Sequence, residues 1–108
     1  MTATGQPKYH QPFAPLPGGF DYVPYNDFAA LQAKVDDTVC AIMLEPIIAE
    51  GGVLVPSVEY IQNVRQLCDD QGILLILDEV QTGLGRTGKL FGYEHFGIEP
   101  DIFTLAKT

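Results

Sequence analysis

Tryptophan is absent from this chain of 108 residues, and basic side chains are scarce, with six Lys and Arg against fourteen Asp and Glu. The formal net charge of −8 would repel a polyanion, and no basic run offsets it, so we expect no nucleic-acid partner. Long hydrophobic runs are also lacking. The longest wholly apolar runs, Val39–Leu44 and Ile73–Leu77, are far too short to span a bilayer, so we predict no membrane-spanning segment.

Cysteine is nearly absent as well. Cys40 and Cys68 lie 28 residues apart, no C-x-x-C spacing occurs, and His10 and His95 are far from both in sequence. We therefore predict no metal site and interpret the cysteines as two buried free thiols in a reducing cytoplasm. The N-terminus has no basic segment followed by an apolar one, so no secretory signal is visible and a cytoplasmic location is predicted.

Proline is concentrated at the start of the chain, where residues 1–24 hold five of the eight prolines together with Gly18 and Gly19. This composition predicts an extended, irregular connection that cannot be helical. The segment also carries four aromatic residues, which indicate that it packs on something: Tyr9, Phe13, Phe20 and Tyr22. The predicted organisation is this connection, residues 1–24, followed by part of a larger domain, residues 25–108.

Helical and extended patterns alternate after this connection. Asn26 or Asp27 can cap a helix that ends near Val35, and Ser57 can cap a second helix that ends before Gly72. The second helix has one apolar face: Val58, Ile61, Val64, Leu67 and Cys68. A helical turn is predicted near 91–96, and three apolar strands at Val39–Pro46, Ile73–Leu77 and Asp101–Lys107.

This alternation predicts an α/β layer of parallel strands with right-handed crossovers, and such strands are usually buried on both faces. Ligands bind at the carboxyl ends of the strands in sheets of this kind. Glu45, Asp78 and Lys107 all fall at or just past those ends. These three side chains are therefore the first candidates for a site.

Gly83–Lys89 fits the phosphate-binding pattern G-x-x-x-x-G-K, which gives one functional hypothesis. Three observations count against it. Leu90 stands where a magnesium-binding Ser or Thr is required, residues 79–82 separate the strand from the glycines, and no helix is expected to begin at Lys89.

The second hypothesis places the chemistry on Asp78 and Lys107. A carboxylate at the end of a buried strand either has a structural partner or pairs with a protonated heterocycle. Lys107 is either an ordinary terminal lysine or a desolvated amine that attacks a carbonyl and forms a Schiff base. Residue chemistry alone leaves both alternatives open.

Two longer segments carry a resemblance to a known family. Asp78–Lys107 reads DEVQTGLGRTGKLFGYEHFGIEPDIFTLAK, and Leu44–Ser57 reads LEPIIAEGGVLVPS. Both resemble the class III aminotransferases, which use pyridoxal phosphate. The opening ATGQPKYHQPFAPLPGGFDYVPYND is similar to the acetylornithine branch of that family. The resemblance covers essentially the whole chain.

The resemblance implies roles for four cofactor-binding residues. Asp78 would pair with the pyridine nitrogen and keep it protonated, so that the ring acts as an electron sink. Lys107 would hold the cofactor as a Schiff base and, once displaced, would shuttle a proton between the substrate and the cofactor. Gln81 would donate a hydrogen bond to the phenolic oxygen. Val80 would pack on one ring face, although a simple core valine is an equally good interpretation.

The resemblance also implies that Glu50 pairs with a substrate-gating arginine that this chain does not contain, and that Glu45 supports the cofactor pocket. The fold would be part of the large PLP-binding domain of a fold-type I transferase, incomplete here because further family segments are expected on both sides. An isolated piece is expected to be inactive and to expose apolar sheet edges.

The function implied is transfer of an amino group from N-acetylornithine to 2-oxoglutarate, in arginine or lysine biosynthesis, by a homodimer. Ornithine, succinyl-diaminopimelate or 4-aminobutyrate are alternative donors of the same class. Two alternatives belong to other functional classes: a nucleotide-binding module and a non-catalytic domain. Asp78, Gln81 and Lys107 occurring together argue against the latter, since a retired site needs none of the three.

Overall fold

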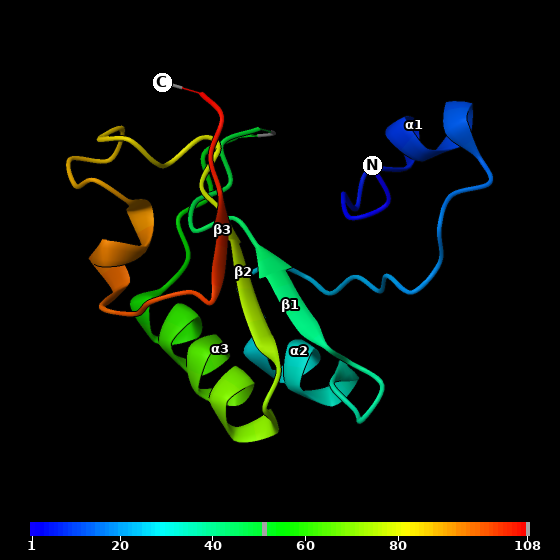
Figure 1. The fold of residues 1–108 in the computed structure, drawn as a ribbon, viewed down its shortest axis with the longest axis horizontal. Coiled ribbons are helices and arrows are strands. Elements are labelled where there is room, and N and C mark those ends of the chain that lie inside the picture. The colour runs from blue at the N-terminus through cyan, green and yellow to red at the C-terminus, as the bar shows by residue number, and fades with distance from the viewer. Residues whose placement is uncertain (51, 108) are drawn as a thin grey trace.

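The computed structural model describes residues 1–50 and 52–107, so Gly51 and Thr108 of the predicted unit 25–108 lie outside the described residues. Three parallel strands form one sheet in the order β1-β2-β3. The elements, shown in Figure 1, are α1 (Pro7–His10), η1 (Gln11–Phe13), α2 (Phe28–Lys34), β1 (Ala41–Leu44), α3 (Val58–Gln71), β2 (Leu74–Asp78), η2 (Gly92–Phe96) and β3 (Ile102–Thr104). The predicted α/β layer with parallel strands is confirmed.

Local capping signals fix both core helices. The Asp27 carboxylate accepts a hydrogen bond from Ala30 N at the start of α2, which decides between the two predicted caps. At the start of α3, Ser57 Oγ accepts one from Tyr60 N. Gly72 ends α3 in the left-handed conformation, with φ of 65°. In the described part of the chain, no helix is both long and apolar enough to cross a membrane.

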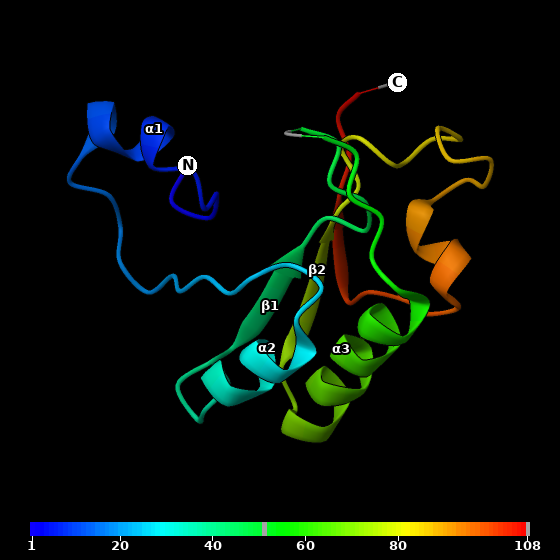
Figure 2. The ribbon, with the colours of Figure 1, turned by 180° about the vertical axis from the view of Figure 1, so that it is seen from behind.

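The core lies between the two helices and one face of the sheet (Figure 2). Its buried apolar residues are Leu31, Ile42, Tyr60, Ile61, Val64, Leu67, Cys68, Leu75, Leu77 and Phe96. The apolar face predicted for α3 is correct except at Val58, which is 48% exposed. Tyr60 takes the buried place in that first turn, because its ring packs edge-on against Tyr25.

The opposite face of the sheet has no cover from the described residues. Met43, Leu74 and Ile102 point to that side and are each close to half exposed. The prediction of strands buried on both faces is therefore wrong for this chain, because α2 and α3 both pack on the same side. β1 and β3 are also shorter than predicted, β2 is shifted by one residue, and Lys107 lies beyond the end of β3.

Two further predictions were wrong. Residues 1–24 do contain helical turns, α1 and η1, because Pro7 and Pro12 occupy the first turn of each, where the missing N–H is not needed. Cys68 is buried and free, and burial raises the pKa of its thiol to about 11. Cys40, in contrast, is exposed, because it precedes β1 at an edge of the sheet.

Asp101 fixes the position of β3 relative to β2 and α3. Its Oδ2 accepts hydrogen bonds from Leu75 N at 2.8 Å and from Arg65 Nη1 at 2.9 Å. Chiefly the hydrogen bond from Leu75, and then the Arg65 guanidinium, lower the pKa of the Asp101 carboxyl. This contact sets the register in which Thr104 of β3 lies opposite Asp78 of β2.

Candidate active site

Asp78 is the last residue of β2 and is only partly buried. One carboxylate oxygen, Oδ1, accepts hydrogen bonds from Val80 N and from Thr104 Oγ1, both at 3.0 Å. Among the described residues, no hydrogen bond reaches the other oxygen, Oδ2. Asp78 therefore has structural partners, one of the two alternatives that the sequence left open, but they bind only one of its two carboxylate oxygens. An acceptor oxygen remains for a ligand.

All six residues predicted for the site lie around one cavity. Asp78, Val80, Gln81 and Lys107 line it together with Glu45 and Glu50. The N-terminal segment forms part of its wall, and so does the uncovered face of the sheet. Residues that are up to 62 positions apart in the sequence are thus brought together, while their individual roles stay predictions.

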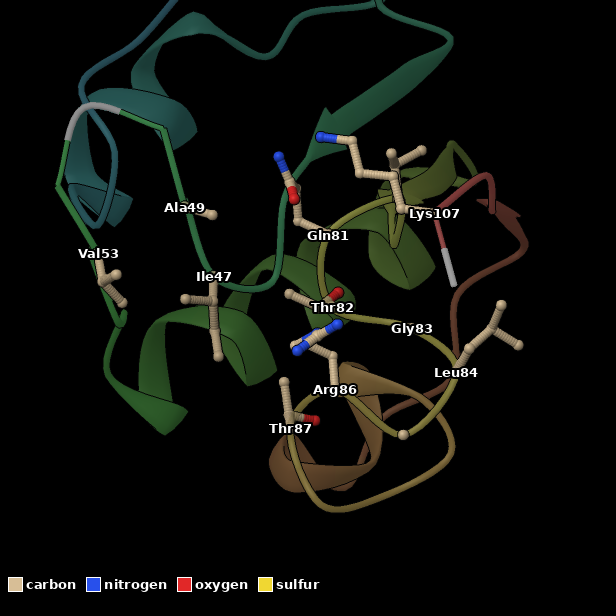
Figure 3. A pocket seen from close by; sticks show the side chains of 12 residues that line it. Ile47, Ala49, Val53, Gln81, Thr82, Gly83, Leu84, Arg86, Thr87 and Lys107 are labelled. Carbon is tan, nitrogen blue, oxygen red and sulfur yellow. The ribbon is translucent and has the colours of Figure 1, made fainter.

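Gln81 and Lys107 also line an adjoining pocket whose floor is the glycine-rich loop. Figure 3 shows the amide of Gln81 and the amine of Lys107 pointing to the same side of that pocket. Val80 adds an apolar surface, and the guanidinium of Arg86 lies further along the wall. The two pockets therefore share three lining residues, Val80, Gln81 and Lys107.

Glu45 contributes negative charge to the cavity. Partial burial, followed by the neighbouring charge of Asp78, raises the pKa of its carboxyl, and Lys107 acts in the opposite direction. Tyr25 Oη donates hydrogen bonds to the carbonyl oxygens of Glu45 and Pro46, which holds the end of β1. Beyond it, Ile48 and Leu54 exchange backbone hydrogen bonds and close the loop that carries Glu50.

Glu79 was not among the predicted site residues, although the structure gives it a central place. The residue is 1% exposed. Its carboxylate accepts hydrogen bonds from Thr82 Oγ1 at 2.6 Å, Gly92 N at 2.9 Å and Tyr93 N at 2.8 Å. The only sequence signal was a second acid after a buried strand, at a position that alternation places on the covered face.

Glu79 positions the segment that carries Val80 and Gln81. It ties Thr82, just after that pair, to the first turn of η2. The fit is close, because a Cβ added at Gly92 would lie 2.9 Å from Thr82 Cβ, and one added at Gly83 would lie 2.6 Å from Leu105 Cδ2. Glycine is required at both positions for the segment to pack in this way.

We expect Glu79→Gln to destabilise the fold by about 1–3 kcal/mol. The amide nitrogen of glutamine would replace one carboxylate oxygen, and a buried backbone N–H would lose its acceptor. Chemical denaturation of the complete gene product would measure the change in the free energy of unfolding. Glu59→Gln is the control, since Glu59 is exposed in the first turn of α3. Equal unfolding free energies for Glu79→Gln and the unsubstituted protein would contradict the assignment.

The glycine-rich loop is not built to bind a nucleotide phosphate. The N–H groups of its glycines are used internally, since Gly83 N donates to Glu79 O, Gly88 N to Gly85 O and Gly85 N to Leu90 O. Lys89 is exposed and is followed by no α-helix; the next helical element is η2, the short 3₁₀ helix. The interpretation of this loop as a tight connection is consistent with the structure.

The sequence matches a known protein family and several curated relatives over nearly its whole length. The profile of the family aminotransferase class-III matches residues 1–108. An acetylornithine aminotransferase of Gloeobacter violaceus is 63% identical over 107 residues, and one of Caldanaerobacter subterraneus subsp. tengcongensis is 64% identical. Each match covers 99% of this chain and 27% of the relative. The chain thus spans about a quarter of the length of these curated relatives.

Solved structures agree in fold. The ornithine aminotransferase of Toxoplasma gondii ME49 matches with a TM-score of 0.91 at 39% identity, over 98% of this chain and 25% of that one. An (S)-enantioselective omega-transaminase of Thermomicrobium roseum matches with a TM-score of 0.90 at 36% identity, over 98% of this chain and 28% of that one. The described strands and helices therefore follow the fold of these enzymes.

Proposed function

The chain belongs to the class III aminotransferases, a pyridoxal-phosphate-dependent family, and we propose that it supplies cofactor-binding residues to an enzyme that transfers an amino group from N-acetylornithine to 2-oxoglutarate. The observation that carries the proposal is identity above 60% to acetylornithine aminotransferases over 99% of the chain. The cavity that gathers Asp78, Gln81 and Lys107 supports it.

The polar side chains that line the cavity fit the ring of pyridoxal phosphate. When bound, the cofactor supplies an aldehyde that reacts with amines and a protonated ring that withdraws electrons from the substrate Cα. Asp78 Oδ2 would accept from the ring N–H, because Oδ1 already accepts two hydrogen bonds. A carboxylate at that atom keeps the nitrogen protonated, because an adjacent negative charge favours the charged form of a heterocycle.

The other residues divide the remaining tasks. Lys107 Nζ would hold the cofactor by condensing with its aldehyde, with release of water, and, when free, would take and return the proton of the donor Cα. Gln81 donates from its amide to the phenolic oxygen. Val80 covers one face of the ring and excludes water from it. Glu45 and Glu50 line the same cavity. Glu50 would pair with a gating arginine that is not in this chain, and Glu45 would support the cavity wall.

The choice of donor is the finer part of the proposal. Ornithine is the second candidate, because ornithine aminotransferases are among the structural matches, at 39% to 49% identity. N-acetylornithine is preferred on the higher identity of the acetylornithine enzymes. We further propose a cytoplasmic homodimer acting in arginine biosynthesis.

A donor panel tests this function. The complete gene product is given pyridoxal phosphate and 2-oxoglutarate, and glutamate formation is measured with N-acetylornithine, ornithine, succinyl-diaminopimelate and 4-aminobutyrate. We expect kcat/KM to be highest for N-acetylornithine, by about tenfold or more, because one or two contacts to the end group of an amino donor give discrimination of this size. A higher kcat/KM for ornithine would select the second candidate, and no glutamate from any donor would refute the proposal.

A further inference from the structure

Thr104 is the residue that contacts Asp78 from the neighbouring strand. The parallel register pairs Asp78 of β2 with Thr104 of β3, so both side chains project from the uncovered face of the sheet. Thr104 Oγ1 donates to Asp78 Oδ1 at 3.0 Å, and Thr104 O accepts from Glu79 N at 3.0 Å. Thr104 therefore holds the end of β2 through both its side chain and its backbone.

The hydroxyl selects which carboxylate oxygen is left for a ligand. Val80 N and Thr104 Oγ1 both donate to Oδ1, and in the described chain Oδ2 has no such donor. Two donors that converge on one oxygen fix the rotation of the carboxylate, and hydrogen bonds to a charged acceptor are the stronger kind. Without the hydroxyl, the backbone donor alone would remain.

We propose that Thr104 is a positioning residue, whose hydroxyl orients the carboxylate of Asp78 so that Oδ2 faces the ring nitrogen of the cofactor. The proposal rests on the proposed function and names no new contact with the substrate. A β-branched residue suits β3 whether or not it carries a hydroxyl, so strand propensity alone does not require threonine. The hydroxyl itself is what the site uses.

The test compares Thr104→Val, which removes the hydroxyl and keeps the shape, with Thr104→Ser, which keeps a donor. Thr38→Val is the matched control, because Thr38 Oγ1 also donates to an aspartate, Asp36, before β1 begins. We expect Thr104→Val to lower kcat and weaken cofactor binding about tenfold each, as the loss of one charge-assisted hydrogen bond implies. Thr104→Ser should recover most of this loss.

Two readouts separate positioning from a merely structural role. KM for the amino donor should stay within about twofold, because Asp78 contacts the cofactor and not the donor. Crystals of the cofactor-free Thr104→Val protein should show the Asp78 carboxylate in more than one orientation. A single unchanged orientation, with wild-type kcat and cofactor affinity, would overturn the proposal.

The crystallographic readout also separates this proposal from the proposed function. If the unsubstituted protein binds no pyridoxal phosphate, the proposed function fails, while the orientation of Asp78 in cofactor-free crystals still decides what Thr104 does. If the unsubstituted protein is an active transaminase and Thr104→Val behaves like Thr38→Val in every readout, the function stands and the role of Thr104 is refuted.

Discussion

Replacement of Lys107 by alanine is expected to lower kcat by about 10⁴-fold, the upper range for a positioned proton-transfer group. Lys107 is the amine of the cavity that lies beside Gln81, and it follows β3 by three residues. In the proposed mechanism it both attaches the cofactor and moves the Cα proton, so two tasks are lost with one side chain. Steady-state glutamate formation in the complete gene product measures the loss.

A second measurement locates the covalent attachment itself. Borohydride reduces the bond between a lysine amine and an aldehyde to a stable secondary amine, so peptide mass spectrometry can find the modified residue. We expect the cofactor mass on the peptide that contains Lys107 and no adduct in Lys107→Ala. An adduct on another lysine, at full activity, would show that the site is elsewhere.

Lys89→Ala is the matched control, and it also tests the nucleotide hypothesis. Lys89 is exposed, and its Nζ donates only a long hydrogen bond of 3.4 Å to Glu94 O. A transaminase should keep kcat within about twofold after this change, as surface substitutions usually do. The reverse pattern, with Lys89 essential for nucleotide binding and Lys107 dispensable, would support a phosphate-binding loop.

The parts of the fold that were predictable are those with local causes. The caps at Asp27 and Ser57 and the left-handed Gly72 each depend on residues within one turn of the helix they bound. The period of the apolar residues predicted α3 for the same reason. Asp78 was also recognisable as a candidate from the sequence, because ligands bind at the carboxyl ends of parallel strands.

The parts that were missed depend on contacts between distant segments. Glu79 becomes central only because Gly92 and Tyr93, more than ten positions later, present their N–H groups to it. Thr104 gains its role from the register with β2, which Asp101 fixes. The exposure of Cys40 follows from its place at a sheet edge, which apolar neighbours in sequence could not reveal.

Asp78→Asn is expected to lower kcat by about 10³-fold, the scale for removing one charge-stabilising group from a catalytic site. The amide is nearly isosteric with the carboxylate, and its oxygen can still accept from Val80 N and Thr104 Oγ1, so the local structure should persist. Its nitrogen would then face the ring nitrogen and could not hold that ring protonated. Kinetics and the visible absorption of the bound cofactor would both report the change.

The control is Asp36→Asn, which alters an exposed aspartate whose Oδ1 also accepts from one backbone N–H and one threonine hydroxyl. Asp36 Oδ1 accepts from the backbone N and from the hydroxyl of Thr38, as Asp78 Oδ1 accepts from Val80 N and Thr104 Oγ1. Any loss due to weakened turn hydrogen bonds should appear in both variants. Because only Asp78 lies on the cavity with Lys107, a loss confined to Asp78→Asn assigns its second oxygen to the cofactor. Equal kcat values in the two variants would make Asp78 a structural aspartate that ties β2 to β3.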